Sequence, residues 1–306
     1  MAEPDFPPGL HVFERGWLSA NNILFAGGDE ILLVDSGYCT HAPQTLSLVE
    51  SVLGSRPLDI LINTHLHSDH CGGNAALQAR YPGLRTFIPP GHARQVADWD
   101  AVALTYLPTG QLCPRFSFTQ TIQPGTSMRF GSAMWQVHAA PGHDPHSLLF
   151  FEPRTRVLIP ADALWENGFG VVFPELEGAD AFAEVAATLD LIERLDPKTV
   201  IPGHGRVFAY APEVLVRARQ RLDSFVSKPS RHAQHAAKVL LKFKLLEIQR
   251  QDFDGFTQWA AETPYFRQIK DKFFPEIPVR AWIGQLSDEL VSAGVAQRDG
   301  DFIVNA

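Results

Sequence analysis

Apolar side chains in the first two thirds of the chain alternate between strand-like and helix-like spacing. Residues 21–37 form two apolar runs joined by a Gly-Gly-Asp turn, which predicts a β-hairpin. Residues 42–54 and 180–196 instead repeat apolar side chains every three or four positions, which predicts amphipathic helices. The run "LDILIN" predicts a buried strand. This alternation predicts a layered α/β fold, with sheets buried beneath helices.

The pattern changes near residue 210, where we predict a domain boundary. Residues 211–306 hold a succession of helix-like segments with short breaks. They end in a predicted hairpin that turns at Asp299-Gly300 or Gly300-Asp301. A helix followed by a terminal hairpin is typical of winged-helix modules. We therefore expect an α/β domain at 1–210 and a mostly helical, winged-helix-like domain at 211–306.

Composition and charge narrow the range of partners. The 306 residues are 45% hydrophobic and 20% charged, which is ordinary for a globular protein with a sizeable core. The net charge of −8 is uneven, because residues 1–210 carry 12 basic and 22 acidic side chains while residues 211–306 carry 14 and 12. This balance disfavours a nucleic-acid or membrane-surface binder. With three cysteines and neither a secretory signal nor a membrane-length apolar run, we expect a cytoplasmic protein without a disulfide scaffold.

A cluster of ionisable side chains follows the predicted strand "LDILIN". The sequence "HLHSDH" places three histidines and an aspartate within six positions. On an extended segment, residues two apart point the same way, so His65, His67 and Asp69 are expected to converge from the strand end. His70 follows at once. Neutral imidazole and carboxylate groups are good ligands for zinc and similar divalent ions.

Three more residues of this kind occupy the same setting downstream. His143 and His204 each follow a strand and a Pro-Gly turn, and Asp162 ends the predicted strand "VLIPAD". Ligands of open α/β sheets bind where strands end. Each residue taken singly is more typical of a turn or a helix cap. Seven ionisable groups in such positions would be costly to bury without a cation, so the sequence predicts a metal centre with enough ligands for two ions.

These motifs resemble the metallo-β-lactamase superfamily in order and spacing. The resemblance rests on "HLHSDH", "PGHD", "IPAD" and "PGHG", together with "LLVDSG" at 32–37, and covers roughly residues 10–210. It implies a four-layer αββα sandwich, with two metal ions between loops at one edge of the two sheets. Residues 1–210 would then form the catalytic domain.

The resemblance also implies a role for each ligand. The first ion would bind His65, His67 and His143, the second would bind Asp69, His70 and His204, and Asp162 would bridge both. Asp35 resembles the structural aspartate of the first motif, which supports the ligand loops. We expect zinc, but iron or manganese occurs in some relatives, and the ligand set does not decide between them.

Several neighbours of the ligands are candidates for supporting or substrate-binding roles. Relatives often have Ser or Thr after the third-motif histidine, whereas this chain has Asp144, which could orient an imidazole. His146 could support a ligand, face the substrate, or simply begin a strand with its hydrogen bonds satisfied. The aromatic run after the bridging aspartate could form an apolar substrate wall or pack in the core, and its members are Trp165, Phe169 and Phe173.

Cys71 lies beside the metal motif and could suggest a nucleophile. With the nearby histidines assigned as ligands, no separate base is left to activate its thiol. A buried cysteine is most often a small hydrophobe, and we predict that role for Cys71, Cys39 and Cys113.

The predicted centre indicates a hydrolase. Two divalent ions that share a bridging water lower its pKa toward about 7, so hydroxide attacks without a side-chain nucleophile. Asp69 could relay a proton to the leaving group, as its equivalent is thought to do in relatives. The acidic first domain and the aromatic run favour a small-molecule thioester, ester or lactone as the substrate.

Two alternatives remain open. A phosphodiesterase or endoribonuclease acting on single-stranded nucleic acid would suit the tail, because one branch of the superfamily pairs this fold with a winged-helix-like domain. Its phosphate-binding side chains would be Lys238, Lys242 and Lys244, which are more typical of the solvated face of an amphipathic helix. A metal-bound regulatory protein with slow turnover is the second alternative. The sequence does not decide whether the chain forms a homo-oligomer.

Overall fold

The computed structural model describes residues 6–306, and the chain divides into two compact units. Unit 1 extends to Leu104 and resumes over Leu112–Leu222, while unit 2 comprises Thr105–Gln111 and Asp223–Ala306. The division after Leu222 falls inside a single helix, whereas the boundary near residue 210 precedes that helix and stays a prediction. No helix in the described part of the chain is long and apolar enough to cross a bilayer.

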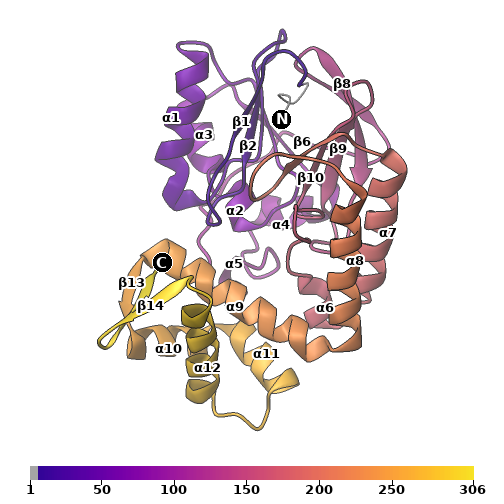
Figure 1. Cartoon of the computed structure of the whole chain (residues 1–306). Helices are drawn as coiled ribbons and strands as arrows, with labels where there is room; N and C mark the ends of the chain where they lie inside the picture. Colours follow the sequence, from indigo (N-terminus) through magenta and orange to yellow (C-terminus); the bar gives the residue numbers. More distant parts are fainter. Residues whose placement is uncertain (1–5) are drawn as a thin grey trace. The chain divides into compact units, whose positions relative to one another are not determined.

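Unit 1 contains two six-stranded sheets (Figure 1). In spatial order the first sheet is β1 (Leu10–Phe13), β2 (Asn22–Phe25), β3 (Leu32–Val34), β4 (Ile60–Ile62), β5 (Arg85–Ile88) and β6 (Gln120–Thr121). The second is β12 (Phe208–Ala209), β11 (Thr199–Pro202), β10 (Val157–Ala161), β9 (Leu148–Glu152), β8 (Ala133–Ala139) and β7 (Ser127–Phe130). The predicted hairpin is the antiparallel pair β2–β3, and β3–β6 pair in parallel.

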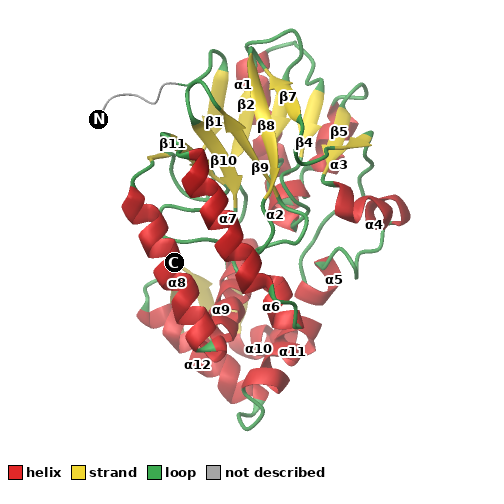
Figure 2. Cartoon of the chain, turned by 90° about the vertical axis from the view of Figure 1, so that its right-hand side faces the viewer, coloured by secondary structure: helices red, strands yellow, loops and turns green. Residues whose placement is uncertain are grey.

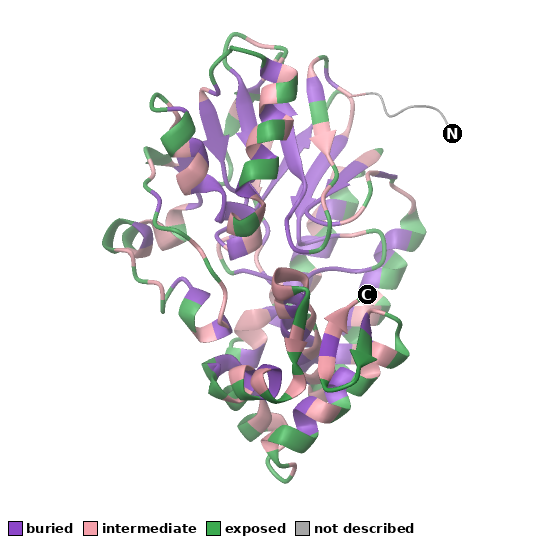
Figure 3. Cartoon of the chain, turned by 90° about the vertical axis from the view of Figure 1, so that its left-hand side faces the viewer, coloured by how far each residue is buried: buried purple, intermediate pink, exposed green. Residues whose placement is uncertain are grey.

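Side chains along the central strands alternate between two apolar environments. In β4, Ile60 and Ile62 belong to a core cluster that also includes Trp135 and Phe150 of the second sheet. Leu61, between them, belongs to a separate cluster with helical residues. Short runs such as "LDILIN" are therefore apolar throughout because both faces of the strand are covered. Figure 3 shows the central strands of unit 1 buried and the outer turns of the helices exposed.

Helices cover the outer faces of the two sheets. Those of unit 1 are η1 (Cys39–His41), α1 (Ala42–Leu53), α2 (Ser68–Cys71), α3 (Asn74–Arg80), η2 (Pro90–His92), α4 (Ala93–Asp98), α6 (Phe173–Glu177), α7 (Ala181–Leu195) and most of α8 (Pro212–Ser227). Val49 of α1 and Leu77 of α3 pack on the first sheet. On the other side, α7 lies beside the second sheet and buries a stripe that includes Val185 and Leu189 (Figure 2). The predicted αββα layering is confirmed.

Unit 2 is mostly helical and holds one small sheet. Its elements are α5 (Tyr106–Thr109), the end of α8, α9 (Pro229–Ile248), β13 (Arg250–Asp252), α10 (Phe253–Glu262), α11 (Pro264–Phe273), α12 (Val279–Ser292), β14 (Ala296–Asp299) and β15 (Phe302–Asn305). The sheet has the order β13-β15-β14, with antiparallel neighbours. The predicted terminal hairpin is β14–β15, which turns at residues 300–301.

One prediction of local structure is wrong. The strand within "LDILIN" ends at Ile62, and the next residues bend into the single helical turn α2, so "HLHSDH" is not an extended segment. Alternation along a strand therefore cannot bring His65, His67 and Asp69 together. Their convergence depends on the path of the loop and of α2.

Candidate metal centre

The candidate ligands come from four loops, each following a strand. His65 and His67 follow β4, and Asp69 and His70 lie on α2 just beyond. The others follow strands of the second sheet. They are His143 after β8, Asp162 after β10 and His204 after β11. Both sheets thus contribute to one site, which forms where their strands end.

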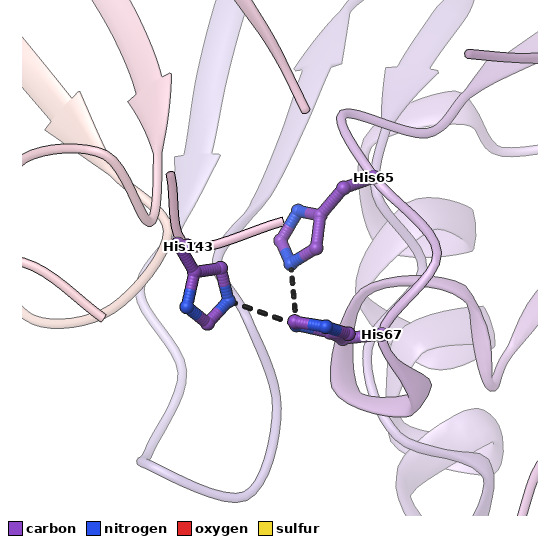
Figure 4. A group of neighbouring side chains, drawn as sticks. All are labelled: His65, His67 and His143. Atoms are coloured by element: carbon purple, nitrogen blue, oxygen red, sulfur yellow. Dashed lines mark hydrogen bonds between the residues drawn. The ribbon is translucent and has the colours of Figure 1, made fainter. Parts of the chain in front are cut away.

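Three imidazoles form the first group, and Figure 4 shows them pointing toward one another. Nδ1 of His67 lies 3.1 Å from Nε2 of His65 and 2.8 Å from Nε2 of His143. In His143 and His65, the hydrogen bond made by Nδ1 outside the group determines that Nε2 faces the other imidazoles. His143 donates from Nδ1 to the carbonyl oxygen of Val171 over 2.5 Å, and Nδ1 of His65 lies 3.1 Å from Oγ1 of Thr64. The Nε2 lone pairs of these two rings therefore point into the group.

Asp69, His70, Asp162 and His204 form the second group. One ligand atom from each lies within 4.8 Å of all the others. Nε2 of His204 is 3.1 Å from Oδ2 of Asp69, and Nε2 of His70 is 3.4 Å from Oδ1 of Asp162. The His70 nitrogen is buried and has no hydrogen-bond partner within residues 6–306. A buried nitrogen without a partner destabilises the folded protein, and a bound metal ion would supply the missing partner.

Asp162 lies between the two groups. Its Oδ2 is 3.5 Å from Nε2 of His143 in the first group and 3.8 Å from Nε2 of His204 in the second. Its Oδ1 accepts a hydrogen bond from Nε1 of Trp165 over 3.2 Å. A carboxylate with one oxygen facing both groups has the position that a bridging ligand requires.

Asp35 orients ligands in both groups without belonging to either. Its Oδ1 accepts the backbone N–H of Thr64 at 2.9 Å, and its Oδ2 accepts the Thr64 hydroxyl at 2.8 Å. The same Oδ2 is 2.7 Å from Nδ1 of His70. Because the hydroxyl of Thr64 donates to Asp35, its lone pair is free to accept from Nδ1 of His65. One buried carboxylate therefore sets the tautomers of two imidazoles.

The backbone approaches the ligands closely. Asp35 and Ala161, the residue before Asp162, both have positive φ, at 57° and 51°. A Cβ added at Gly203 would lie 2.1 Å from Oδ1 of Asp162. Local backbone strain of this kind persists only where the surroundings over-determine it, and such strain is commonest at functional sites. At Gly203, only glycine leaves room for the Asp162 carboxylate.

The two groups differ in their electrostatics. Burial lowers the pKa of His65 well below its usual value and that of His67 to about 4, so these imidazoles are neutral near pH 7. In the second group, burial opposes ionisation, but Asp35 and Asp162 outweigh it and raise the pKa of His70 well above its usual value. Against the effect of burial, His204 and His70 hold the pKa of Asp162 well below its usual range. The second group therefore attracts positive charge.

Aromatic side chains surround the ligands. The Phe173 ring meets the His67 ring edge-on, with centroids 5.4 Å apart, and Trp165 meets His204 in the same way at 5.6 Å. Phe169, by contrast, is buried. Trp17 stacks on His204 at 5.6 Å and 10° between planes, yet 55% of it is exposed. Trp17 therefore offers an apolar surface to solvent directly beside the second group.

Of the two polar neighbours of His143, Asp144 lies beside the first ligand group and His146 points to another histidine. Oδ2 of Asp144 is 3.8 Å from Nε2 of His67, and Oδ1 of Asp144 accepts the backbone N–H of His146 at 2.7 Å. The His146 ring instead packs edge-on against His92, with centroids 4.5 Å apart. Asp144 can thus orient a first-group imidazole, while His146 contacts a different histidine.

Sequence reasoning missed Trp17, Thr64 and Gly203. Thr64 precedes "HLHSDH" directly, and a hydroxyl beside a ligand motif is a usable signal for a supporting residue. Gly203 sits inside the quoted "PGHG" motif, where a glycine beside a ligand suggests close backbone approach. Trp17 has no comparable signal, because it lies far from every motif and reaches the centre only through the fold.

The donor set fits divalent metal ions. Inward imidazole lone pairs and ionised carboxylates are the ligand types that such ions prefer, and each group has three or four of them. The buried Nε2 of His70, 3.4 Å from Oδ1 of Asp162 and without a well-formed hydrogen bond in the described residues, has a position that fits a ligand atom. The geometry does not distinguish zinc from iron or manganese.

Comparison with known proteins bears on the family of the chain. The family model described as "Metallo-beta-lactamase superfamily" matches residues 15–204. The hydroxyacylglutathione hydrolase of Anaeromyxobacter dehalogenans (strain 2CP-C) is 31% identical over 197 residues, covering 63% of this chain and 65% of that protein. The mitochondrial persulfide dioxygenase ETHE1 of Bos taurus is 30% identical over 141 residues, or 46% of each protein.

A solved structure supports the fold along nearly the whole chain. The metallo-beta-lactamase family protein TTHA1429 from Thermus thermophilus has a TM-score of 0.56 and 18% sequence identity, covering 98% of this chain and 99% of that one. The chain spans between about half and two thirds of the length of the curated relatives it matches. By its matched family and its fold, the chain belongs to the metallo-β-lactamase superfamily.

Proposed function

We propose that the chain is a metal-dependent hydrolase of small-molecule acyl compounds, with thioesters preferred over esters and lactones. The observation that carries the proposal is the pair of ligand groups with Asp162 between them. The similarity to a hydroxyacylglutathione hydrolase supports the thioester class. We propose that His65, His67 and His143 hold one ion, that Asp69, His70 and His204 hold a second, and that Asp162 contacts both. We expect zinc in both positions.

When bound, the two ions would supply Lewis acidity and an activated water for attack on the acyl carbon. The protein's own contribution is to orient its ligands and to manage protons. The contacts of Thr64 and Val171 leave inward lone pairs on His65 and His143 before any ion arrives. Asp35 holds Nδ1 of His70, so that Nε2 of this ring is the nitrogen that faces an incoming ion. This preorganisation avoids a rearrangement during the reaction.

Asp69 is the second-group ligand best placed to handle a proton from the reacting molecule. Its side chain is 15% exposed, whereas those of His70, Asp162 and His204 are at most 5% exposed. Its Oδ2 is held by Nε2 of His204 at 3.1 Å, which leaves Oδ1 for the leaving group. We propose that Oδ1 of Asp69 accepts a proton from the attacking water and passes it to the leaving group, while the exposed face of Trp17 supports the acyl part of the substrate.

We also propose that unit 2 is winged-helix-like. The order helix α9, strand β13, three helices and hairpin β14–β15 supports this, as does the three-stranded sheet that β13 completes. Its lysines do not favour the nucleic-acid alternative. Lys238 pairs with Glu289 at 2.8 Å, and Lys244 pairs with Glu247 at 3.0 Å. Nζ of Lys242 donates to the carbonyl oxygen of Val295 at 2.5 Å. These contacts compete with phosphate binding.

The test is a hydrolysis screen with protein whose metal content has been measured. The substrates are acyl thioesters, esters, lactones, bis(p-nitrophenyl) phosphate and short RNA. We expect thioester hydrolysis that Asp162→Ala lowers by several orders of magnitude together with metal content. The control Asp190→Ala, which changes an exposed aspartate on α7, should retain both. Full activity in metal-stripped protein, or oxygen consumption with a persulfide in place of hydrolysis, would refute the proposal.

A further inference from the structure

The three cysteines of the chain gather beside the ligand loop, although they are far apart in the sequence. Sγ of Cys71, on α2, lies 3.8 Å from Sγ of Cys113. Sγ of Cys39, on η1, lies 3.5 Å from the carbonyl oxygen of Leu112, the residue before Cys113. All three belong to unit 1. The sequence-based view of them as separate small hydrophobes does not account for this convergence.

We propose that Cys71 and Cys113 form a reversible disulfide, with a low-molecular-weight disulfide as the oxidant. A disulfide needs the sulfurs about 2.05 Å apart, so they must approach by roughly 1.8 Å. Residues 111–118 have no regular secondary structure, so no helix or strand hydrogen bonds oppose a movement of Cys113. Cys71 is fixed on α2 and fully buried, whereas Cys113 is partly exposed. An oxidant therefore reaches Cys113 before it reaches Cys71.

The reaction balances in two exchanges. The sulfur of Cys113 attacks the small disulfide, which releases one small thiol and leaves a mixed disulfide on Cys113. The sulfur of Cys71 then attacks the Cys113 sulfur and releases the second small thiol. In total, the two protein thiols lose two protons and two electrons, and the small disulfide takes them up and becomes two thiols. An excess of small thiol reverses both steps.

Closure removes a hydrogen-bond donor from the ligand loop. In the reduced protein Sγ of Cys71 lies 3.3 Å from the carbonyl oxygen of His67 and 3.4 Å from that of Leu66. The same His67 carbonyl accepts the backbone N–H of Cys71 at 3.1 Å and that of His70 at 3.0 Å. A disulfide sulfur has no hydrogen to donate, so closure removes the thiol's hydrogen bonds to the carbonyl oxygens of Leu66 and His67. We infer that oxidation loosens the turn that carries these residues.

The experiment treats reduced, metal-free protein with increasing oxidised glutathione and measures free thiols and intact mass. We expect two of the three thiols to disappear, the mass to fall by about 2 Da for two lost hydrogens, and digestion to yield a peptide that links Cys71 to Cys113. Cys39→Ser should still close this bond, and Cys113→Ser should not. A glutathione adduct that persists on Cys113, a linked Cys39–Cys113 peptide, or an unchanged thiol count would overturn the proposal.

Hydrogen exchange tests the structural consequence on the same samples. Amides of residues 68–71 should exchange about tenfold faster in the oxidised protein than in the reduced protein. Treated Cys113→Ser should show no change. Equal exchange in both forms of the wild-type protein would overturn the loosening of α2. A weaker hold on metal in the oxidised protein is a further consequence, and it rests on the proposed function. The mass and exchange measurements use metal-free protein, so they test the disulfide independently of the hydrolase proposal.

Discussion

The substitution Asp35→Asn tests whether one buried carboxylate sets the ligand tautomers. Asparagine has nearly the same shape and tolerates the positive φ of 57°, so the backbone should stay in place. What changes is hydrogen bonding. Asp35 now accepts from Nδ1 of His70 and from two groups of Thr64, whereas an asparagine side chain has one oxygen and one NH2 donor.

The magnitude follows from the two possible orientations of the new amide. If its NH2 faces His70, the imidazole must accept at Nδ1 and carry its proton on Nε2, the nitrogen that faces the second group. Loss of a partner of this kind lowers metal affinity about 10- to 100-fold. If the NH2 instead faces the backbone N–H of Thr64, two buried donors oppose each other, at a cost of about 1–3 kcal/mol of unfolding free energy. Each orientation thus predicts a measurable loss.

The assay combines a metal-binding titration against a competing chelator with urea unfolding of the metal-free protein. Asp59→Asn is the matched control, because Asp59 accepts a backbone hydrogen bond from Ile31 in the same unit but touches no ligand. Asp35→Asn should lose either metal affinity or stability beyond that control. A variant that matches the control in both measurements would refute the role assigned to Asp35.

Three further predictions concern other parts of unit 1. Gly203→Ala places a Cβ 2.1 Å from Oδ1 of Asp162, so we expect kcat/KM to fall about 100-fold together with a loss of bound metal. The control Gly83→Ala, at a position with open space around it, should leave both kcat/KM and metal content unchanged. Trp17→Ala removes apolar area beside the site, so it should raise KM for long-chain acyl thioesters by up to about tenfold, with a smaller effect on kcat. Trp17→Phe should recover part of the loss. Equal effects on short and long acyl chains would contradict this prediction. Burial opposes ionisation of Glu152, but hydrogen bonds from the hydroxyl and backbone N–H of Thr155 lower its pKa. The ionised Glu152 side chain therefore stabilises the fold at pH values above the ordinary glutamate pKa. This stabilisation is lost as the pH falls through the lowered pKa. Glu152→Gln should therefore be less stable than the wild type at pH 7 in urea unfolding, with a difference that shrinks below about pH 4; a difference independent of pH would contradict the prediction.

The sequence alone determined the main strands and helices of the first unit and the identity of the candidate ligands. In β4 the run "ILI" is apolar because alternate side chains enter two different cores, and this pattern is local enough to read from the chain. The helices α1 and α7 follow likewise from their apolar spacing. Histidines and aspartates just beyond strand ends marked the candidate metal centre, because strand ends in such sheets meet at one edge.

Only the tertiary structure decided how those side chains meet. The helical turn α2, and not an extended strand, carries Asp69 and His70 into the site. Which nitrogen of each imidazole faces inward depends on partners from distant loops, such as Val171 for His143. Trp17 and the Cys71–Cys113 pair were equally invisible in the sequence. Periodicity records which face of one element is buried, but a site is assembled from several loops at once, and their relative paths are fixed only when the sheets and helices pack.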